Sequence, residues 1–326
     1  MIRFVRMATR ALVLGVLAFP PVAVWAQAPY PSKPVRMVIG FPAGSSTDVL
    51  GRVLASKLGD IMGQQFVVDN KPGAGSNIAA ELVARAPGDG YTLLLGGVTN
   101  AVNVTLTPDV SFNPVKDIIP VALTATIPNI LVVNPAMNVS NVREFIALAK
   151  AKPGEITYGS AGNGTSPHLS GELFNLMAGT KLLHVPYKGS NQAVTDLLGG
   201  RISAMFSPAS TVIPHIRSGK LKALASTTSQ RPGIAADIPT VSESGLPGYD
   251  TAIWFGLMAP GTTPSAIVER IADAVAQALD SADVKAQFVS QGIDPFKGGP
   301  SEYARFQAQE IEKWARVIKA AGIKAE

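Results

Sequence analysis

Apolar residues in this chain follow two spacings that alternate from the N-terminal third onward. In some stretches, such as residues 35–39 and 91–95, they stand side by side, which is typical of buried strands. In the stretches between, such as residues 49–61, they recur every three or four positions, which is typical of amphipathic helices. This order of strand and helix predicts a parallel sheet covered by helices.

The same two spacings predict elements along the whole chain. We expect strands at residues 35–39, 66–69, 91–95, 129–133, 156–159, 181–185, 202–206, 221–225 and 252–259. We expect helices at residues 49–61, 77–85, 142–151, 169–178, 193–198 and 212–218, a helix that follows Thr263 as N-cap, and a last helix from Ser301.

These elements divide into two α/β lobes. The Pro- and Gly-rich stretch 231–248 ends a second βα unit, and the strand after it resembles a return to the first lobe. We therefore expect one lobe of residues 27–125 with 249–326 and another of residues 126–248, joined by at least two chain crossings. Such an arrangement forms a hinge, and ligands favour the cleft between two lobes.

Residues 1–26 have the composition of a cleaved export signal. Arginines at positions 3, 6 and 10 precede the apolar residues 11–19, and Val24-Trp25-Ala26 is a small-residue cleavage site. The alternative is an uncleaved anchor, but the apolar run is too short to span a bilayer comfortably. Cleavage lowers the formal charge from +5 to +2, and no block of five like charges remains, so nucleic acid is not an expected partner.

The chain contains no cysteine. In an exported protein this means that stability depends on core packing rather than disulfides, and that no lipid is attached through an N-terminal cysteine. We expect a freely soluble protein confined to a Gram-negative periplasm.

Two glycine- and serine-rich turns, residues 40–48 and 159–168, each join an expected strand to an expected helix. A helix N-terminus carries unpaired N–H groups and a partial positive charge, so it attracts anions. Either turn alone could be a tight loop without a ligand. Two of them, rich in short hydroxyls, in one bilobal chain favour the binding of a small carboxylate. A third candidate, residues 96–100, stands at the carboxyl end of a strand, where open α/β sheets hold ligands.

Motifs for catalysis, metals and cofactors are missing from the sequence. The three histidines, His168, His184 and His215, are scattered and lack metal-ligand spacing. The segment around Ser160 resembles a nucleophile elbow only loosely, and its register is wrong. Asp48 is better interpreted as a helix or loop cap than as a general base. We therefore expect neither an enzyme nor a metal or cofactor site; a hydrolase would require a nucleophile–base pair that the sequence does not supply.

Six motifs in their order along the chain resemble the Bug family, the periplasmic receptors of tripartite tricarboxylate transporters. The motifs are residues 41–48, 70–75, 87–93, 158–168, 185–189 and 254–257. The resemblance covers essentially the whole mature chain, and the ordered set is far more specific than any one motif.

The resemblance implies a type II periplasmic-binding-protein fold that closes on a small carboxylate and then docks, as a monomer, on membrane subunits. Family members usually hold the carboxylate through main-chain groups and waters from turns that match residues 41–47 and 160–166. Residues 97–100, 187–190 and 207–210 would line the remainder. The implied ligand-binding residues are Phe41, Ala43, Gly44, Ser45, Ser46, Thr47, Gly97, Thr99, Ser160, Ala161, Gly164, Thr165, Ser166, Tyr187, Gly189 and Ser207.

Two departures from the family pattern bear on the ligand. Ser45 stands where the family usually has a second glycine, and Ser207-Pro208 stands where it often has Asp-Asn. The missing acid argues against an amino acid and favours a fully anionic or partly apolar ligand. Aromatic contact with such a ligand is open to Phe41 and Tyr187, whereas Phe206 and Trp254 are better interpreted as core.

The leading hypothesis is thus a periplasmic carboxylate receptor for uptake. The alternative is a sensory protein of the same fold that presents its ligand to a membrane kinase. Dicarboxylates, tricarboxylates, aromatic carboxylates and nicotinate-like acids all stay open, because water-mediated contacts leave little trace in residue identity.

Overall fold

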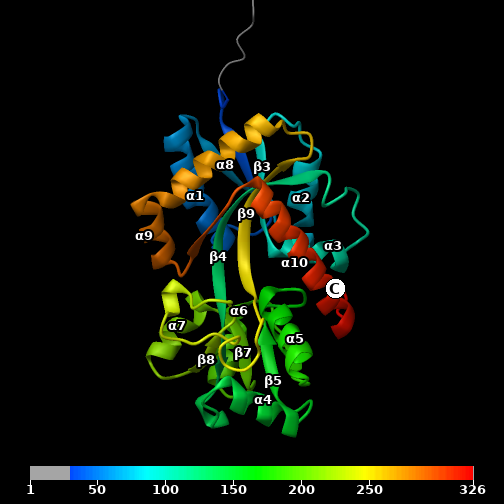
Figure 1. Cartoon of the computed structure of the whole chain (residues 1–326), viewed down its shortest axis with the longest axis vertical. Coiled ribbons are helices and arrows are strands. Elements are labelled where there is room, and N and C mark those ends of the chain that lie inside the picture. Colours follow the sequence, from blue (N-terminus) through cyan, green and yellow to red (C-terminus); the bar gives the residue numbers. More distant parts are fainter. Residues whose placement is uncertain (1–29, 326) are drawn as a thin grey trace, which may run out of the picture.

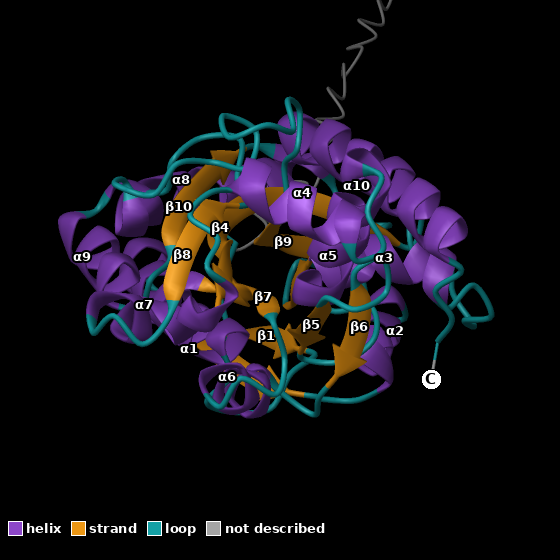
Figure 2. Ribbon diagram, turned by 90° about the horizontal axis from the view of Figure 1, so that it is seen from below, coloured by secondary structure: helices purple, strands orange, loops and turns teal. Residues whose placement is uncertain are grey.

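Two α/β lobes stacked along the long axis make up the computed structural model, which describes residues 30–325 (Figure 1). The expected export signal, residues 1–26, lies outside the described residues. Long strands β4 and β9 run between the lobes, and helices lie on both sides of the strands (Figure 2). This is the periplasmic-binding-protein architecture that the resemblance implied.

Strands and helices alternate for most of the chain, as the apolar spacing predicted. The strands are β1 (Val35–Ile39), β2 (Phe66–Asn70), β3 (Thr92–Gly97), β4 (Ile118–Val133), β5 (Thr157–Ser160), β6 (Leu183–Pro186), β7 (Ala204–Pro208), β8 (Lys222–Ser226), β9 (Ala252–Pro260) and β10 (Asp294–Gly298). The α-helices are α1 (Ser46–Met62), α2 (Asn77–Ala84), α3 (Val98–Leu106), α4 (Val142–Ala151), α5 (Ser166–Ala178), α6 (Ser190–Leu198), α7 (Ala209–Arg217), α8 (Ser265–Asp280), α9 (Ala282–Ser290) and α10 (Pro300–Ala321).

Strand β4 belongs to both lobes. Its first part, residues 118–128, pairs antiparallel with β9, and its last part, residues 129–133, pairs with β7 and β8. The partner changes between Pro128 and Asn129, and β9 begins on the other crossing at Ala252. In one lobe the order is β2-β1-β3-β9-β4, and in the other it is β4-β7-β5-β6. We refer to these as lobe 1 and lobe 2.

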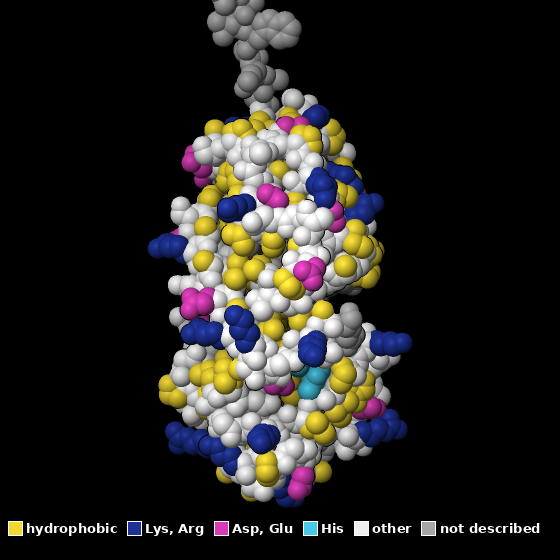
Figure 3. Space-filling view, turned by 90° about the vertical axis from the view of Figure 1, so that its right-hand side faces the viewer, with side chains coloured by type: hydrophobic (Ala, Val, Ile, Leu, Met, Phe, Trp, Pro, Cys, Tyr) yellow, Lys and Arg dark blue, Asp and Glu magenta, His cyan; other side chains and the backbone are white. Residues whose placement is uncertain are grey.

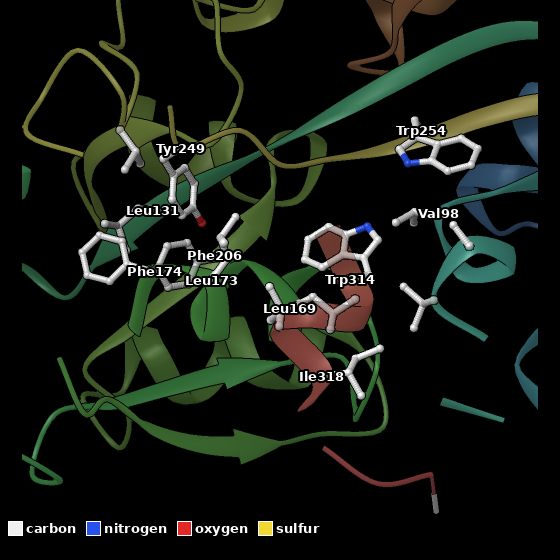
Figure 4. Packing of buried hydrophobic residues seen from close by; sticks show 14 of the residues in the cluster. Val98, Leu131, Leu169, Leu173, Phe174, Phe206, Tyr249, Trp254, Trp314 and Ile318 are labelled. Carbon is white, nitrogen blue, oxygen red and sulfur yellow. The ribbon is translucent and has the colours of Figure 1, made fainter. Parts of the chain in front are cut away.

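The C-terminal helix α10 joins the two lobes on one side. Its residues Trp314 and Ile318 are buried and lie beside Leu169 of α5, in a cluster that continues to Phe174 and Phe206 in lobe 2 (Figure 4). Burying an aromatic or aliphatic side chain of this size stabilises the fold by about 1.5–3 kcal/mol. Helix α10 therefore fixes part of the spacing between the lobes.

Several elements differ from the sequence prediction. Helices α3 and α9 and strand β10 were not expected, and β4 begins at Ile118 rather than at residue 129. The prediction that Thr263 caps a helix is wrong. The N-cap of α8 is Pro264, without a side-chain cap bond, and the Thr263 N–H instead donates to the carbonyl of Pro260 at 2.9 Å in the preceding turn.

The described surface carries charges of both signs. On the face drawn in Figure 3, Lys and Arg side chains are interspersed with Asp and Glu over both lobes. Among residues 30–325, no helix has the combination of length and apolar character that crossing a membrane requires.

Candidate functional site

A cavity of about 240 Å³ opens between the lobes at the carboxyl ends of several strands. Helices α1 and α3 of lobe 1 and helices α5, α6 and α7 of lobe 2 all direct their N-termini toward it. We call this space the ligand cavity. Its lining is Phe41, Ser45, Ser46, Thr47, Gly96, Gly97, Val98, Thr99, Ala161, Thr165, Ser166, Pro167, Ser190, Pro208, Ile253, Trp254 and Phe255.

The first turn of α1 is held by a buried carboxylate. Asp48 accepts hydrogen bonds from the Gly44 N–H at 2.9 Å, from Arg52 Nε at 2.9 Å and from Asn70 Nδ2 at 3.0 Å. The hydrogen bond from Arg52 is the largest cause that lowers the pKa of Asp48 to about 2, against the opposing effect of burial. Ser45 caps the helix by accepting the Asp48 N–H at 3.3 Å. Asp48 therefore shapes the turn, as the sequence indicated.

The turn before α5 is closed by hydrogen bonds within itself. The Thr165 hydroxyl donates to the Gly162 carbonyl at 2.7 Å, and the Gly164 N–H donates to His168 Nδ1 at 3.0 Å. Gly162 and Gly164 have φ angles of +123° and +70°, which only glycine adopts readily. These bonds leave Ala161, Thr165 and the first residue of α5 on the cavity side.

A buried asparagine links this turn to the hinge. Asn129, the first lobe 2 residue of β4, donates to Ser166 Oγ at 2.8 Å and to Ser170 Oγ at 3.2 Å. Its side-chain amide oxygen, Oδ1, is buried without a hydrogen-bond partner among the described residues. Sequence reasoning did not identify this residue; the only signal is a polar residue inside an apolar run.

The remaining wall of the cavity is apolar. Phe41 follows β1, and Ile253, Trp254 and Phe255 belong to β9, next to the crossing. Trp254 is 2% exposed, and its Nε1 donates to a carboxylate oxygen of Glu310 at 2.7 Å. The prediction that Trp254 fills the core is confirmed, and the ring also borders the cavity. No lining residue carries a charged side chain.

Nine of the sixteen residues expected to bind a ligand line the cavity. They are Phe41, Ser45, Ser46, Thr47, Gly97, Thr99, Ala161, Thr165 and Ser166. The other seven, Ala43, Gly44, Ser160, Gly164, Tyr187, Gly189 and Ser207, lie outside the lining. Ile253 and Phe255 also line the cavity and were not among the expected ligand-binding residues, although Phe255 belongs to the motif at residues 254–257 and both residues follow an expected chain crossing.

Each of those seven residues lies outside the lining for a reason found in its own turn or strand. Gly44 and Gly164 shape their turns through positive φ angles. Ser160 and Ser207 are fully buried at strand ends, and the Tyr187 hydroxyl donates to Asp196 at 2.8 Å, toward α6. Ala43 is exposed, and Gly189 is the N-cap of α6, one position before Ser190, which lines the cavity.

A serine–histidine pair that the sequence did not predict lies behind the second turn. Ser160 Oγ is 2.6 Å from His184 Nε2, and the rings of His184 and His168 stack at 3.8 Å. Burial lowers the pKa of His168 to about 3 and that of His184 to about 4, so both rings are neutral at pH 7. Ser160 is fully buried and also accepts the Gly162 N–H at 3.0 Å. A nucleophile must reach its substrate, so this geometry is structural.

Within residues 30–325 no three His, Cys, Asp or Glu side chains gather in a way that could hold a metal ion. The ligand cavity thus offers main-chain N–H groups, hydroxyls and apolar surface. Such a set can bind an anion with a carbon body, and the lining contains no carboxyl, imidazole, amine or thiol side chain.

Comparison with known proteins gives consistent matches over nearly the whole chain. Residues 50–323 match the family described as the tripartite tricarboxylate transporter family receptor. Protein BugT of Bordetella pertussis is 39% identical over 297 residues, which cover 90% of this chain and 91% of BugT.

Solved structures of similar proteins have the same two-lobed fold. Rpa4515 of R. palustris, with adipate, has a TM-score of 0.77 and 36% identity, and the match covers 90% of this chain and 99% of that one. MatC from Rhodopseudomonas palustris, with bound malate, has a TM-score of 0.73 and 31% identity, and the match covers 89% of this chain and 100% of that one.

Proposed function

Because this chain belongs to the family of tripartite tricarboxylate transporter receptors, which are periplasmic solute-binding proteins, we propose that it captures a small organic carboxylate between its lobes. The captured ligand is then delivered to the membrane subunits of such a transporter. The observation that carries the proposal is the convergence of the N-termini of α1, α3, α5, α6 and α7 on one cavity without charged side chains.

Main-chain groups supply the attraction for the anion. The first N–H groups of a helix have no acceptor within it, and the helix dipole adds a partial positive charge at that end. Both lobes contribute such helices, so a carboxylate that reaches both sides favours the closed arrangement. The flexing points are the crossings at Pro128–Asn129 and at the start of β9.

The apolar wall narrows the class of ligand. Phe41, Ile253, Trp254 and Phe255 would contact carbon rather than a second polar array. With no lysine or arginine in the lining, charge is balanced only by dipoles, which suits one or two carboxylates better than a densely charged ion. The adipate and malate seen with the two relatives are of this kind.

We expect capture without chemical change of the ligand. Ser160, which has a histidine partner, is fully buried behind the turn. Incubating the protein with its ligand and recording NMR spectra should give back the ligand unaltered, whereas formation of a product would contradict a pure binding role.

A thermal-shift screen tests the proposal directly. Mature protein, residues 27–326, is melted with di-, tri- and aromatic carboxylates, each paired with its neutral amide. A ligand at about 1,000 times its Kd stabilises by about 4 kcal/mol, so a true ligand raises the melting temperature markedly. If no carboxylate shifts the transition, or if the amides shift it equally, anion capture in this cavity is refuted.

Two serines of α5 provide a matched pair of variants. Ser166 lines the cavity, whereas Ser170 does not, although both accept a hydrogen bond from Asn129. We expect Ser166→Ala to weaken carboxylate binding by about 1–2 kcal/mol, because a hydroxyl donor is lost, and Ser170→Ala to leave the affinity unchanged. Equal losses in calorimetric titration would mean that Ser166 acts only through Asn129.

A further inference from the structure

A second cavity, of about 420 Å³, lies on the other side of the crossing strand β9. Along β9, Ile253 and Phe255 line the ligand cavity, whereas Ala252 lines the second one, and Trp254 borders both. We call this second space the hinge cavity. Residues 228–233 of lobe 2 form one wall, and β10 and α10 of lobe 1 form the other.

Aromatic rings form one part of the hinge cavity. Phe306 of α10 packs edge-to-face against Trp254, with ring centroids 5.2 Å apart, and against Phe296 of β10, also at 5.2 Å. Phe296 and Phe306 are only partly buried, so each leaves ring surface exposed at the cavity. Aromatic faces attract cations, most strongly where water is partly excluded.

Two carboxylates at the cavity have no cationic partner among the described residues. Asp294, two positions before Phe296 on β10, is half-buried, and burial raises its pKa, partly offset by the backbone N–H of Gly233. Asp250 accepts the Ser229 N–H at 2.9 Å and forms no ion pair within residues 30–325. No cation of the described residues forms an ion pair with either acid, so both contribute negative charge at the cavity, Asp294 from a half-buried position and Asp250 from an exposed one.

The cations of the same wall are already neutralised. Arg231 pairs with Glu243 at 3.1 Å, and Lys313 pairs with Glu310. Lys313 also donates to the main-chain carbonyl of Asp250 at 3.1 Å. The charge that stays unpaired at the hinge cavity is therefore negative. The helix N-termini at the ligand cavity carry partial positive charge, so the two cavities attract ions of opposite sign.

We propose that the hinge cavity binds a small organic ammonium ion, with Asp294 and Asp250 supplying the counter-charge and Phe296 and Phe306 supplying the ring surface. A bare metal ion fits less well, because the described residues contain no group of three His, Cys, Asp or Glu side chains that could hold one. An occupant touches both lobes, so its binding is linked to lobe movement and, reciprocally, to capture in the ligand cavity.

Choline and its uncharged isostere 3,3-dimethylbutan-1-ol test this site by isothermal titration calorimetry on the mature protein without carboxylate. Saturable binding of choline, and none of the isostere, is expected. Failure of choline to saturate at about 10 mM, or equal affinity for the two probes, overturns the proposal.

Variants locate the binding. Asp294→Asn should weaken choline binding by about tenfold and Phe296→Leu by about threefold or more, whereas Asp109→Asn, at an exposed residue outside the hinge cavity, should leave it within about twofold. Asp250→Asn serves as the second acidic variant if Asp294→Asn unfolds, as judged by circular dichroism. Unchanged affinity in every folded acidic variant refutes the site. These outcomes do not depend on whether a carboxylate binds on the other side of β9.

Discussion

Replacing Asp48 by asparagine tests how the first turn of α1 is held. The Asp48 side chain is 4% exposed, and it joins Gly44, Arg52 and Asn70. Asparagine has nearly the same shape but no charge, so it imitates the protonated aspartic acid. The variant thus isolates the contribution of the negative charge to the free energy of unfolding.

The size of that contribution follows from the pKa. One pKa unit corresponds to about 1.4 kcal/mol, so lowering the pKa of Asp48 from 3.8 to about 2 stabilises the folded chain by about 2 kcal/mol at pH 7. Because the folded pKa is below the unfolded one, this stabilisation is present above pH 3.8 and is lost as the pH falls through 2. About half of it should be left at pH 3.

Urea unfolding followed by circular dichroism at pH 7, 5 and 3 measures the difference. We expect Asp48→Asn to be less stable than the unmodified protein by about 2 kcal/mol at pH 7 and by about half as much at pH 3. Asp109→Asn, at an exposed aspartate, is the control and should change stability by less than about 0.5 kcal/mol. A pH-independent difference, or one no larger than in the control, would refute the charge-based account.

Two further predictions concern close packing and acid sensitivity. A Cβ added at Gly97 would lie 2.3 Å from the main-chain oxygen of Trp254, so Gly97→Ala should cost about 1–3 kcal/mol in calorimetric unfolding, while Gly189→Ala, with no atom within 4 Å, should be nearly neutral. Similar melting temperatures for these two variants would count against the clash. His168 and His184 have folded pKa values of about 3 and about 4, below the ordinary 6.5, so the unfolded chain binds protons first and stability should decline as the pH falls from 6.5 to 4. In His184→Gln the free energy of unfolding should fall less steeply with pH, because unfolding then takes up about one proton fewer. Identical slopes for the two proteins in urea titrations at several pH values would disprove this.

The sequence predicted most elements because their apolar spacing was regular, and it failed where local preference opposes the fold. Helix α3, Val98–Leu106, is rich in β-branched residues and asparagine, which are poor helix formers. It is held instead by packing against α10, with Asn100 accepting the Gly97 N–H at 2.9 Å. Strand β4 contains Pro120 and Pro128, and proline is disfavoured inside a strand; the register with β9 shifts between Pro120 and Ala122, an irregularity that tolerates proline.

The sequence predicted those parts of the candidate site that short sequence motifs mark. Turns rich in glycine and serine between strand and helix mark α1 and α5 without any knowledge of the fold. The approach of α6 and α7 depends on the strand order β4-β7-β5-β6, which no local pattern encodes. At the end of β7, side chains alternate between faces, so Ser207 turns inward and its neighbour Pro208 reaches the cavity. That the lining residues bind a ligand stays a prediction.

The lack of ionisable side chains around the ligand cavity has a consequence for how capture responds to acidity and to evolution. Where the peptide backbone provides the attraction, nothing on the protein side of the contact titrates, so the acid dissociation of the metabolite itself should govern retention in mildly acidic surroundings. Substitutions at Phe41, Ile253 or Phe255 can then change which size of carboxylic acid fits the cavity, while the main-chain N–H groups still attract its carboxylate. One scaffold can in this way serve many different acids.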